Sequence, residues 1–224
     1  LNTLHQKNSS LVFEEIYSKK LWLGDYNFVN ENLFYSGPGS HSPKIISSYI
    51  RSLSKVFSLP NRSSILDYGC GDFNVGKNIL NKYGKFISKY YALDILKPLI
   101  EFNKKNFSSI YPDVEFHLLD NNYHLPRVDY CICRQVLQHL SNKDILLTIN
   151  KIMKASDYLI LTDHVPFLKN KPNVDIVTGR DTRVSLNSYI DISKPPFSIK
   201  FTYLNIIDTC RVENGFIITY LIKF

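Results

Sequence analysis

The chain lacks the features that membrane, disulfide and zinc proteins need. None of its apolar runs reaches the roughly 20 residues that cross a bilayer. Its first residues, 1–7, are too polar for a secretory signal. The four cysteines form no Cys-x-x-Cys pair, so we expect buried, reduced thiols, no metal site and a cytoplasmic location.

Dense blocks of positive charge are also missing. Lysine and arginine outnumber aspartate and glutamate by 27 to 20, which gives a net charge of +7 and a pI of about 9.1. A basic surface can attract nucleic acid. Because the lysines are scattered along the chain, we do not expect nucleic acid as the partner.

One segment, Ser64–Asn74, has the pattern of a ligand-binding turn. It reads as a short apolar strand, a turn with Gly69 and Gly71, and the start of a helix, with Asp67 just before the turn. This order places backbone N–H groups, a helix N-terminus and a carboxylate around a ligand. A dinucleotide fingerprint needs a third glycine where this chain has Asn74. The alternative is a turn whose glycines serve only backbone geometry.

Five apolar runs alternate with helical patterns, which predicts an α/β fold with a parallel sheet covered on both faces. The runs are 64–67, 89–95, 114–120, 128–133 and 157–163. The first three end in the carboxylates Asp67, Asp94 and Asp120. Asp94 lies about 20 residues beyond the glycine turn, the spacing at which an acid meets ribose hydroxyls. Because ligands bind at the carboxyl ends of such strands, we expect one shared site.

The flanking segments predict a helical cover and a C-terminal strand pair. Apolar residues recur at helical spacing in 11–21 and again after Ser42-Pro43, with an irregular loop in 22–41 between them. Residues 165–198 show no clear period, and a connection this long is usually a lid or binding loop. Residues 201–224 read as two strands. With 224 residues, the chain suffices for one such domain and not for two.

Residues 62–164 resemble the class I S-adenosylmethionine-dependent methyltransferases, whose first motif has an acid before the first glycine. The C-terminal strand pair extends the resemblance, because NAD-binding domains usually lack it. Residues 13–197 further resemble a mostly uncharacterised bacterial and phage-type group. Its motifs here are Ser36-Gly37-Pro38-Gly39-Ser40, Cys70-Gly71-Asp72-Phe73-Asn74, Leu93-Asp94-Ile95, the segment from Cys133 to Ser141, Ile176-Val177-Thr178-Gly179 and Pro196-Phe197. The chain departs from this group at Val75 and at Asp163-His164, so the acceptor is not carried over.

The resemblance implies S-adenosylmethionine as the cofactor and a Rossmann-like, doubly wound seven-stranded sheet with an N-terminal helical extension. It implies one domain, with the helices and a cofactor-covering loop in 1–61, the cofactor-binding core in 62–164, and the substrate loop and strand pair in 165–224. The resemblance also implies a role for each site residue. Asp67, Gly69 and Gly71 would bind the methionine part of the cofactor, with Asp72 and Phe73 beside it, and Asp94 would bind the ribose. Ile95, Asp120 and Asn121 would contact the adenine, Arg134 and Gln135 would lie near the sulfonium, and the loop with Ser36 and Gly37 would cover the cofactor.

Three histidines are candidates for a catalytic base. Methyl transfer is an in-line displacement, so the enzyme mainly positions two reactants. A base is needed when the acceptor is a hydroxyl or a protonated amine. His139, after the fourth run, is the first candidate, with a histidine packed against the sheet as the alternative. His164 with Asp163 is the second, and His41 the third.

Two arginines have competing interpretations. Arg134 or Arg183 would suit an anionic acceptor such as a carboxylate or phosphate. A solvated surface position is the alternative for Arg183.

The absence of certain motifs excludes several classes of methyl acceptor. DNA amino-methyltransferases carry an Asn/Asp-Pro-Pro-aromatic motif after the fourth strand, where this chain has Cys-Arg-Gln-Val at 133–136. The acid sets of catechol-type and arginine methyltransferases are also missing. We therefore expect a small-molecule or glycan acceptor, methylated on oxygen. A catalytically inactive cofactor-binding module that regulates a partner and an NAD-dependent oxidoreductase remain the alternatives.

Overall fold

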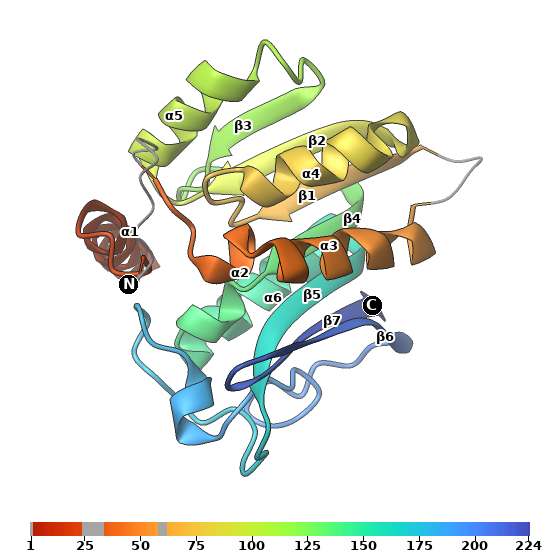
Figure 1. The fold of residues 1–224 in the computed structure, drawn as a ribbon. Helices are drawn as coiled ribbons and strands as arrows, with labels where there is room; N and C mark the ends of the chain where they lie inside the picture. Colours follow the sequence, from red (N-terminus) through yellow and green to blue (C-terminus); the bar gives the residue numbers. More distant parts are fainter. Residues whose placement is uncertain (1, 24–33, 58–61) are drawn as a thin grey trace.

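The computed structural model describes residues 2–23, 34–57 and 62–224 (Figure 1). Within these residues the strands are β1 (Ser63–Tyr68), β2 (Ile87–Asp94), β3 (Val114–Leu118), β4 (Val128–Arg134), β5 (Ser156–Pro166), β6 (Tyr203–Val212) and β7 (Gly215–Lys223). They form one sheet in the order β3-β2-β1-β4-β5-β7-β6. Strands β1 to β5 run parallel, whereas β7 pairs antiparallel with both β5 and β6. The predicted fold class is confirmed.

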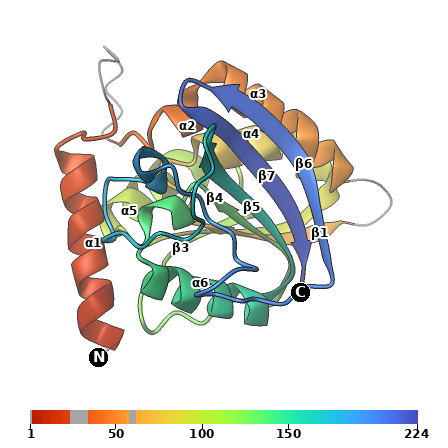
Figure 2. The same cartoon turned by 90° about the horizontal axis from the view of Figure 1, so that it is seen from below.

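The helices divide between the two faces of this sheet. They are α1 (Asn2–Ser18), α2 (Pro38–His41), α3 (Pro43–Ser52), α4 (Asn74–Tyr83), α5 (Lys97–Phe107) and α6 (Asn142–Ala155), with the short 3-10 helices η1 (Leu53–Lys55), η2 (Gly84–Phe86), η3 (Leu137–His139) and η4 (Arg183–Leu186). Figure 2 shows α3 and α4 on one face, α6 on the other, and α1 along the side. None of these described helices is long and apolar enough to span a membrane.

Several helices begin at the capping residues and prolines from which the sequence predicts a helix start. The hydroxyl of Ser141 accepts the N–H of Asp144 at 3.2 Å and caps α6. Proline occupies the first turn of α3 and of α5, where its missing N–H costs nothing. Helix α4 follows the glycine turn directly. Part of the predicted loop at 22–41, residues 24–33, lies outside the described residues, and its end forms α2.

Neighbouring strand residues point to opposite faces and build two cores. Leu66, Cys131 and Cys133 belong to the core beside α6, whereas Ile65 and Ile132 belong to the core beside α3 and α4. All four cysteines are buried with free thiols, which confirms that expectation. Each large aliphatic side chain buried this way contributes about 1.5–3 kcal/mol. The two cores hold the strand ends in register, and the site is built there.

The long connection at 165–198 is held by a buried arginine. Arg183 is 2% exposed, and its guanidinium donates to the carbonyls of Val174 and Leu140, each at 2.8 Å, and to Oδ1 of Asn142 at 2.9 Å. Both predicted roles of Arg183 are therefore wrong. The side chain is neither a surface residue nor an anion site, because backbone carbonyls that would otherwise lack donors use its N–H groups.

Candidate active site

The described structure has a cavity of about 620 Å³ at the carboxyl ends of β1, β2, β4 and β5. Its wall combines the glycine turn after β1, the residues after β2 and β4, one side of α6, and the turn between β6 and β7. Described residues between Ser9 and Trp22 and between Ser36 and Ile45 complete it. The predicted site residues that line it are Ser36, Gly37, Asp67, Gly69, Gly71, Asp94, Ile95, Asn121, Arg134, Gln135, His139 and His164. The sheet thus brings together residues that lie up to 128 positions apart (36 to 164).

The glycine turn is shaped so that only glycine fits. Gly69 and Gly71 have φ angles of 80° and 56°, which favour glycine. A Cβ added at Gly71 would lie 2.3 Å from Oγ of Ser36, and one at Gly69 would lie 2.5 Å from Val136. The N–H of Gly69 donates to the carbonyl of Leu93 at 2.8 Å, which ties the turn to β2. The turn therefore forms a tight cradle in the cavity wall.

Two buried carboxyls stand beside this cradle. Asp94 accepts the N–H of Gly71 at 3.1 Å and that of Leu96 at 3.2 Å, and burial raises its pKa to about 6. Asp67 accepts the hydroxyl of Tyr90 at 2.7 Å, and burial raises its pKa to about 7. Asp94 is held in position by backbone donors, so it presents a fixed acceptor to hydroxyls of a ligand.

The loop before α2 is fastened to the glycine turn. The N–H of Ser36 donates to Oδ2 of Asp72 at 2.9 Å, and the N–H of Asp72 donates to Oγ of Ser36 at 2.8 Å. The hydroxyl of Tyr17 lies 2.9 Å from the same Oγ, and Nε2 of His41 lies 2.6 Å from Oδ2 of Asp72. The side-chain amide of Asn74 donates to the carbonyl of Ser40 at 2.6 Å. These bonds hold the loop across the cavity.

A buried arginine fastens the same loop to the end of β4. Nη2 of Arg134 donates to the carbonyl of Gly39 at 2.8 Å, and its guanidinium lies 4.9 Å from the centre of the Tyr49 ring. Gln135 has a φ of 55°, and a Cβ added at Gly39 would lie 2.0 Å from its side-chain oxygen. Arg134 and Gln135 therefore meet the loop as well as the cavity, and burial lowers the pKa of Arg134.

Four predicted site residues lie outside the cavity wall. Asp72 is used by the loop, and its carboxylate also accepts the N–H of Asn74 at 3.1 Å. Phe73 is fully buried and packs edge-on against Phe116, so it belongs to the core rather than to the site. Asp120 is exposed and accepts the N–H of Asn122 at 2.9 Å, which is a local turn.

The fourth residue outside the wall is Asp163. It is 2% exposed, and neither carboxyl oxygen has a hydrogen-bond partner among the described residues. Burial raises its pKa to about 8, opposed in part by the positive charge of Arg183 and by the nearby backbone of Gln138. Adjacent strand residues face opposite sides of a sheet, so Asp163 faces away from the cavity that His164 lines, contrary to the predicted pairing of the two.

The two histidines in the wall differ in what their ring nitrogens contact. Nδ1 of His139 donates to the carbonyl of Arg180 at 3.1 Å, and its Nε2 lies 3.2 Å from the amide nitrogen of Gln138. Burial lowers the pKa of His139 to about 4, so the ring is neutral and both nitrogens are in use. Nε2 of His164 is buried without a partner among the described residues, and burial lowers its pKa as well.

Some lining residues have no signal in the sequence. Phe13, Trp22 and Ile45 come from the N-terminal segment, and Val212 and Ile217 flank the turn between β6 and β7. The sequence predicts an acceptor pocket shaped by residues 165–198 together with the N-terminal residues 1–42. Described residues of the N-terminal part do line the cavity, whereas no residue of 165–198 does. The connection packs around Arg183, while the turn between β6 and β7 reaches the cavity because β7 lies next to β5.

A family model described as a methyltransferase domain matches residues 60–189, so the chain belongs to that family. A search of curated proteins finds no match. The fold and the family together define a class I S-adenosylmethionine-dependent methyltransferase, and S-adenosylmethionine is its cofactor.

Solved structures with the same fold include three methyltransferases. Magnesium protoporphyrin IX methyltransferase from Synechocystis PCC 6803, with S-adenosylhomocysteine, has a TM-score of 0.58 and 16% identity and covers 97% of this chain and 100% of its own. Human N-acetylserotonin methyltransferase, with S-adenosylmethionine, has a TM-score of 0.58 and 15% identity and covers 80% of this chain, which spans only 52% of the human protein. A methyltransferase from Aquifex aeolicus has a TM-score of 0.52 and 16% identity, with coverages of 82% and 93%.

The shape and the polar groups of the cavity fit this cofactor. The cradle at Gly69 and Gly71 is one that any Cβ would fill, and the fixed carboxylate of Asp94 opens on the same cavity. A volume of about 620 Å³ lies within the range of small-molecule and cofactor sites. When bound, the cofactor supplies a methyl carbon that its sulfonium activates.

Proposed function

We propose that the enzyme methylates a hydroxyl group of a small molecule or glycan, with His164 as the base. The observation that carries this proposal is that His164 lines the cavity and its buried Nε2 has no partner among the described residues. A neutral imidazole can accept the proton of a hydroxyl as the oxygen attacks, and burial keeps His164 neutral by lowering its pKa. His139 is the weaker candidate, because an amide and a carbonyl already engage its two nitrogens.

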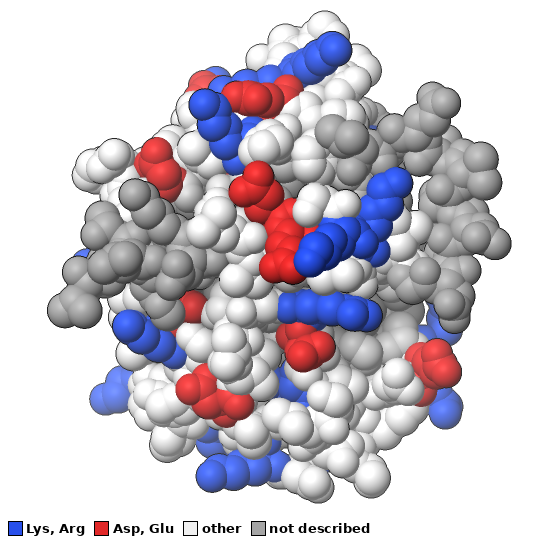
Figure 3. All heavy atoms as spheres, turned by 90° about the vertical axis from the view of Figure 1, so that its left-hand side faces the viewer, with Lys and Arg blue, Asp and Glu red and all other residues white. Residues whose placement is uncertain are grey.

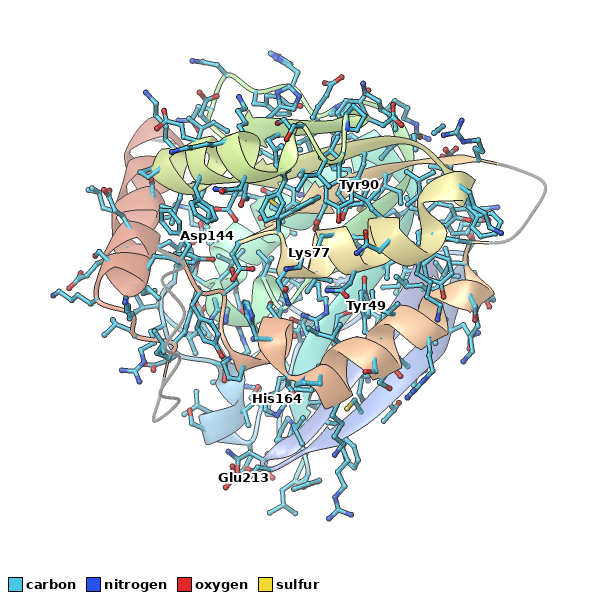
Figure 4. All side chains as sticks on the ribbon, turned by 45° about the horizontal axis from the view of Figure 1, so that its top comes forward. Tyr49, Lys77, Tyr90, Asp144, His164 and Glu213 are labelled. Carbon is cyan, nitrogen blue, oxygen red and sulfur yellow. The ribbon has the colours of Figure 1, made fainter. Side chains whose placement is uncertain are left out.

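The acceptor side of the cavity is the part next to β5 and β7. Ile45, Val212 and Ile217 line it with apolar surface, and Glu213 lies at the turn between β6 and β7. Figure 4 shows His164 and Glu213 in the lower part of the view, with Asp144, another residue of the cavity wall, above them. Apolar wall residues exclude water, and the few hydrogen-bonding groups among them, such as His164 and Glu213, can orient a small acceptor.

Charge and similarity also support a small acceptor. On the face drawn in Figure 3, acidic and basic side chains are intermixed, whereas a nucleic-acid site presents a basic patch. The names of the enzymes from Synechocystis and human specify small molecules, magnesium protoporphyrin IX and N-acetylserotonin. These names support the proposed class of acceptor and not its identity.

We further propose that the chain belongs to the bacterial and phage-type group named in the sequence analysis. The contact between its two most specific motifs supports this. Ser36 and Asp72 exchange two hydrogen bonds, and Ser40 accepts one from Asn74. The two motifs therefore work as one unit, the cover of the cofactor. We also propose that the single domain has the three predicted parts, residues 1–61, 62–164 and 165–224. Within the last part, we assign the acceptor contacts to the turn between β6 and β7.

The test is methyl transfer by the His164→Gln variant. Wild-type protein is incubated with S-adenosylmethionine carrying a labelled methyl group and a panel of phenols, sugars and amines. With the acceptor found, we expect His164→Gln to lower kcat by about 10²- to 10⁴-fold. Binding of S-adenosylhomocysteine, measured by calorimetry, should stay within a factor of two to three. His139→Gln is the matched control, with a smaller loss of kcat.

Three outcomes contradict the proposal. Full turnover by His164→Gln would show that His164 is not the base. Transfer only to amines would show that the acceptor atom is not oxygen. Tight binding of S-adenosylhomocysteine without transfer to any member of the panel favours the non-catalytic alternative, in which the protein regulates a partner.

A further inference from the structure

Trp22 is the only tryptophan in the chain, and it follows α1 at the edge of the cavity. Its ring centre lies 5.2 Å from that of Tyr17 and 5.2 Å from that of His139. A Cβ added at Gly37 would touch its side chain at 3.7 Å. Three separate elements, α1, the loop before α2, and η3, therefore fix the indole in the wall.

The indole N–H has no hydrogen-bond partner within residues 2–23, 34–57 and 62–224. Nε1 of Trp22 is buried, and no acceptor among the described residues lies within hydrogen-bond distance. An indole can only donate, so an oxygen or nitrogen acceptor must come from elsewhere. Burying such a donor unpaired costs about 1–3 kcal/mol. A ligand oxygen in the cavity would remove this cost.

The position of Trp22 assigns it to the cofactor side of the cavity. It packs in the same apolar cluster as Ile95, the residue after Asp94, together with Phe13 and Tyr17. The acceptor-side residues Ile45 and Ile217 belong to a different cluster. The indole thus lies near Ile95, which follows the predicted ribose-binding residue Asp94, and away from the turn between β6 and β7.

We propose that Trp22 is a cofactor-binding residue: its ring closes the cofactor site, and its Nε1–H donates a hydrogen bond to an oxygen of the bound cofactor. S-Adenosylmethionine and its product offer carboxylate and ribose hydroxyl oxygens and few other strong acceptors outside the adenine. The inference concerns the cofactor only, and it stands whatever the acceptor and the catalytic base prove to be.

Intrinsic fluorescence of the full chain tests the inference directly. Because Trp22 is the only tryptophan, tryptophan-selective excitation reports on this side chain alone. Titration with S-adenosylhomocysteine should change the emission in a saturable way, with the same midpoint as calorimetry. At saturation, quenching by acrylamide should fall because the ligand covers the ring.

The Trp22→Phe variant removes the hydrogen-bond donor and shortens the ring. Phenylalanine keeps one aromatic ring in the wall and lacks both the N–H and the second ring of the indole, so we expect the Kd for S-adenosylhomocysteine to rise about 5- to 50-fold. Tyr203→Phe is the matched control, since Tyr203 is 46% exposed on the edge strand β6 and should leave the Kd unchanged. Circular dichroism checks that both variants fold.

Either of two results would overturn the proposal. The first is a Trp22→Phe variant that folds and binds S-adenosylhomocysteine as tightly as wild type. The second is wild-type emission and acrylamide quenching that do not change at a concentration where calorimetry shows saturation. The second measurement needs no variant, so it decides the question even when Trp22→Phe fails to fold.

Discussion

Burial controls the chemistry of individual ionisable residues in this enzyme. Asp67, Asp94 and Asp163 all lose solvent, and burial raises the pKa of each, to about 7, 6 and 8. Asp67 and Asp94 regain hydrogen bonds from Tyr90 and from backbone N–H groups, whereas Asp163 regains none among the described residues. The first two line the cavity and can act on a ligand, and Asp163 only costs stability.

Because ionised Asp163 is unfavourable in its buried position, the free energy of unfolding depends on pH. The unfolded carboxyl ionises near its ordinary pKa of 3.8, and the folded one near about 8. Between these values the folded state binds the additional proton, so the free energy of unfolding falls as pH rises. Asp163→Asn removes this term. We expect the variant to gain about 1–3 kcal/mol relative to wild type between pH 5 and pH 8, measured by urea unfolding.

The control for this measurement is Asp157→Asn on the same strand. Asp157 is exposed and pairs with Arg127, so its variant should differ from wild type by less than about 0.5 kcal/mol at both pH values. Asp67 and Asp94 contribute equally in all three proteins and cancel. A difference between Asp163→Asn and wild type that does not grow with pH would contradict the interpretation.

At the scale of elements, the glycine turn and the loop before α2 act as one structure. The loop contributes Ser36 to the turn, and the turn contributes Asp72 to the loop. Tyr17 of α1 and Arg134 at the end of β4 fasten the same loop from two further sides. A change in the turn should therefore reach the loop before α2, the proposed cover of the cofactor, and not only the backbone of the turn.

Gly71→Ala tests this coupling. The new Cβ would lie 2.3 Å from Oγ of Ser36, and the φ of 56° disfavours a side chain, so the loop must shift. We expect the affinity for S-adenosylhomocysteine to fall at least 10-fold by calorimetry while the fold is kept. Gly84→Ala is the matched control, because no atom lies within 4 Å of its Cβ position, and it should bind like wild type. Equal binding by Gly71→Ala would show that the loop is not coupled to the turn.

At the scale of the whole molecule, the cavity joins segments from both ends of the chain. Phe13 and Trp22 lie near the start, and Val212 and Ile217 lie near the end. A ligand that fills this cavity contacts several elements at once and stabilises them together. Ligand binding should therefore appear as a shift of the global unfolding transition.

Thermal unfolding with two ligands distinguishes the enzyme classes. S-Adenosylhomocysteine at about 100 times its Kd should add about 2.7 kcal/mol and raise the Tm by roughly 5–10 °C. NAD at the same concentration should leave the Tm unchanged, because the turn has Asn74 where a dinucleotide site needs glycine. A shift with NAD alone would reinstate the oxidoreductase alternative.

Local patterns in the sequence determined most of the fold and part of the site. Hydrophobic periodicity located β1 to β5, and two of the three strand-end acids, Asp67 and Asp94, together with Gly69 and Gly71, line the cavity, whereas the third acid, Asp120, lies outside it. These features are readable because they depend on neighbours in the chain: the period of a strand, the φ angle of a glycine, the cap of a helix.

Only the tertiary structure decided which side chains face the ligand and which are buried elsewhere. Asp163 and His164 are adjacent in sequence and point to opposite faces of the sheet. Arg183 is buried among carbonyls more than 40 positions away, such as that of Leu140, and Trp22 reaches the cavity only because α1 packs against it. These contacts join residues distant in the chain, so no local pattern encodes them, and burial then sets the charge and the available hydrogen bonds of each group.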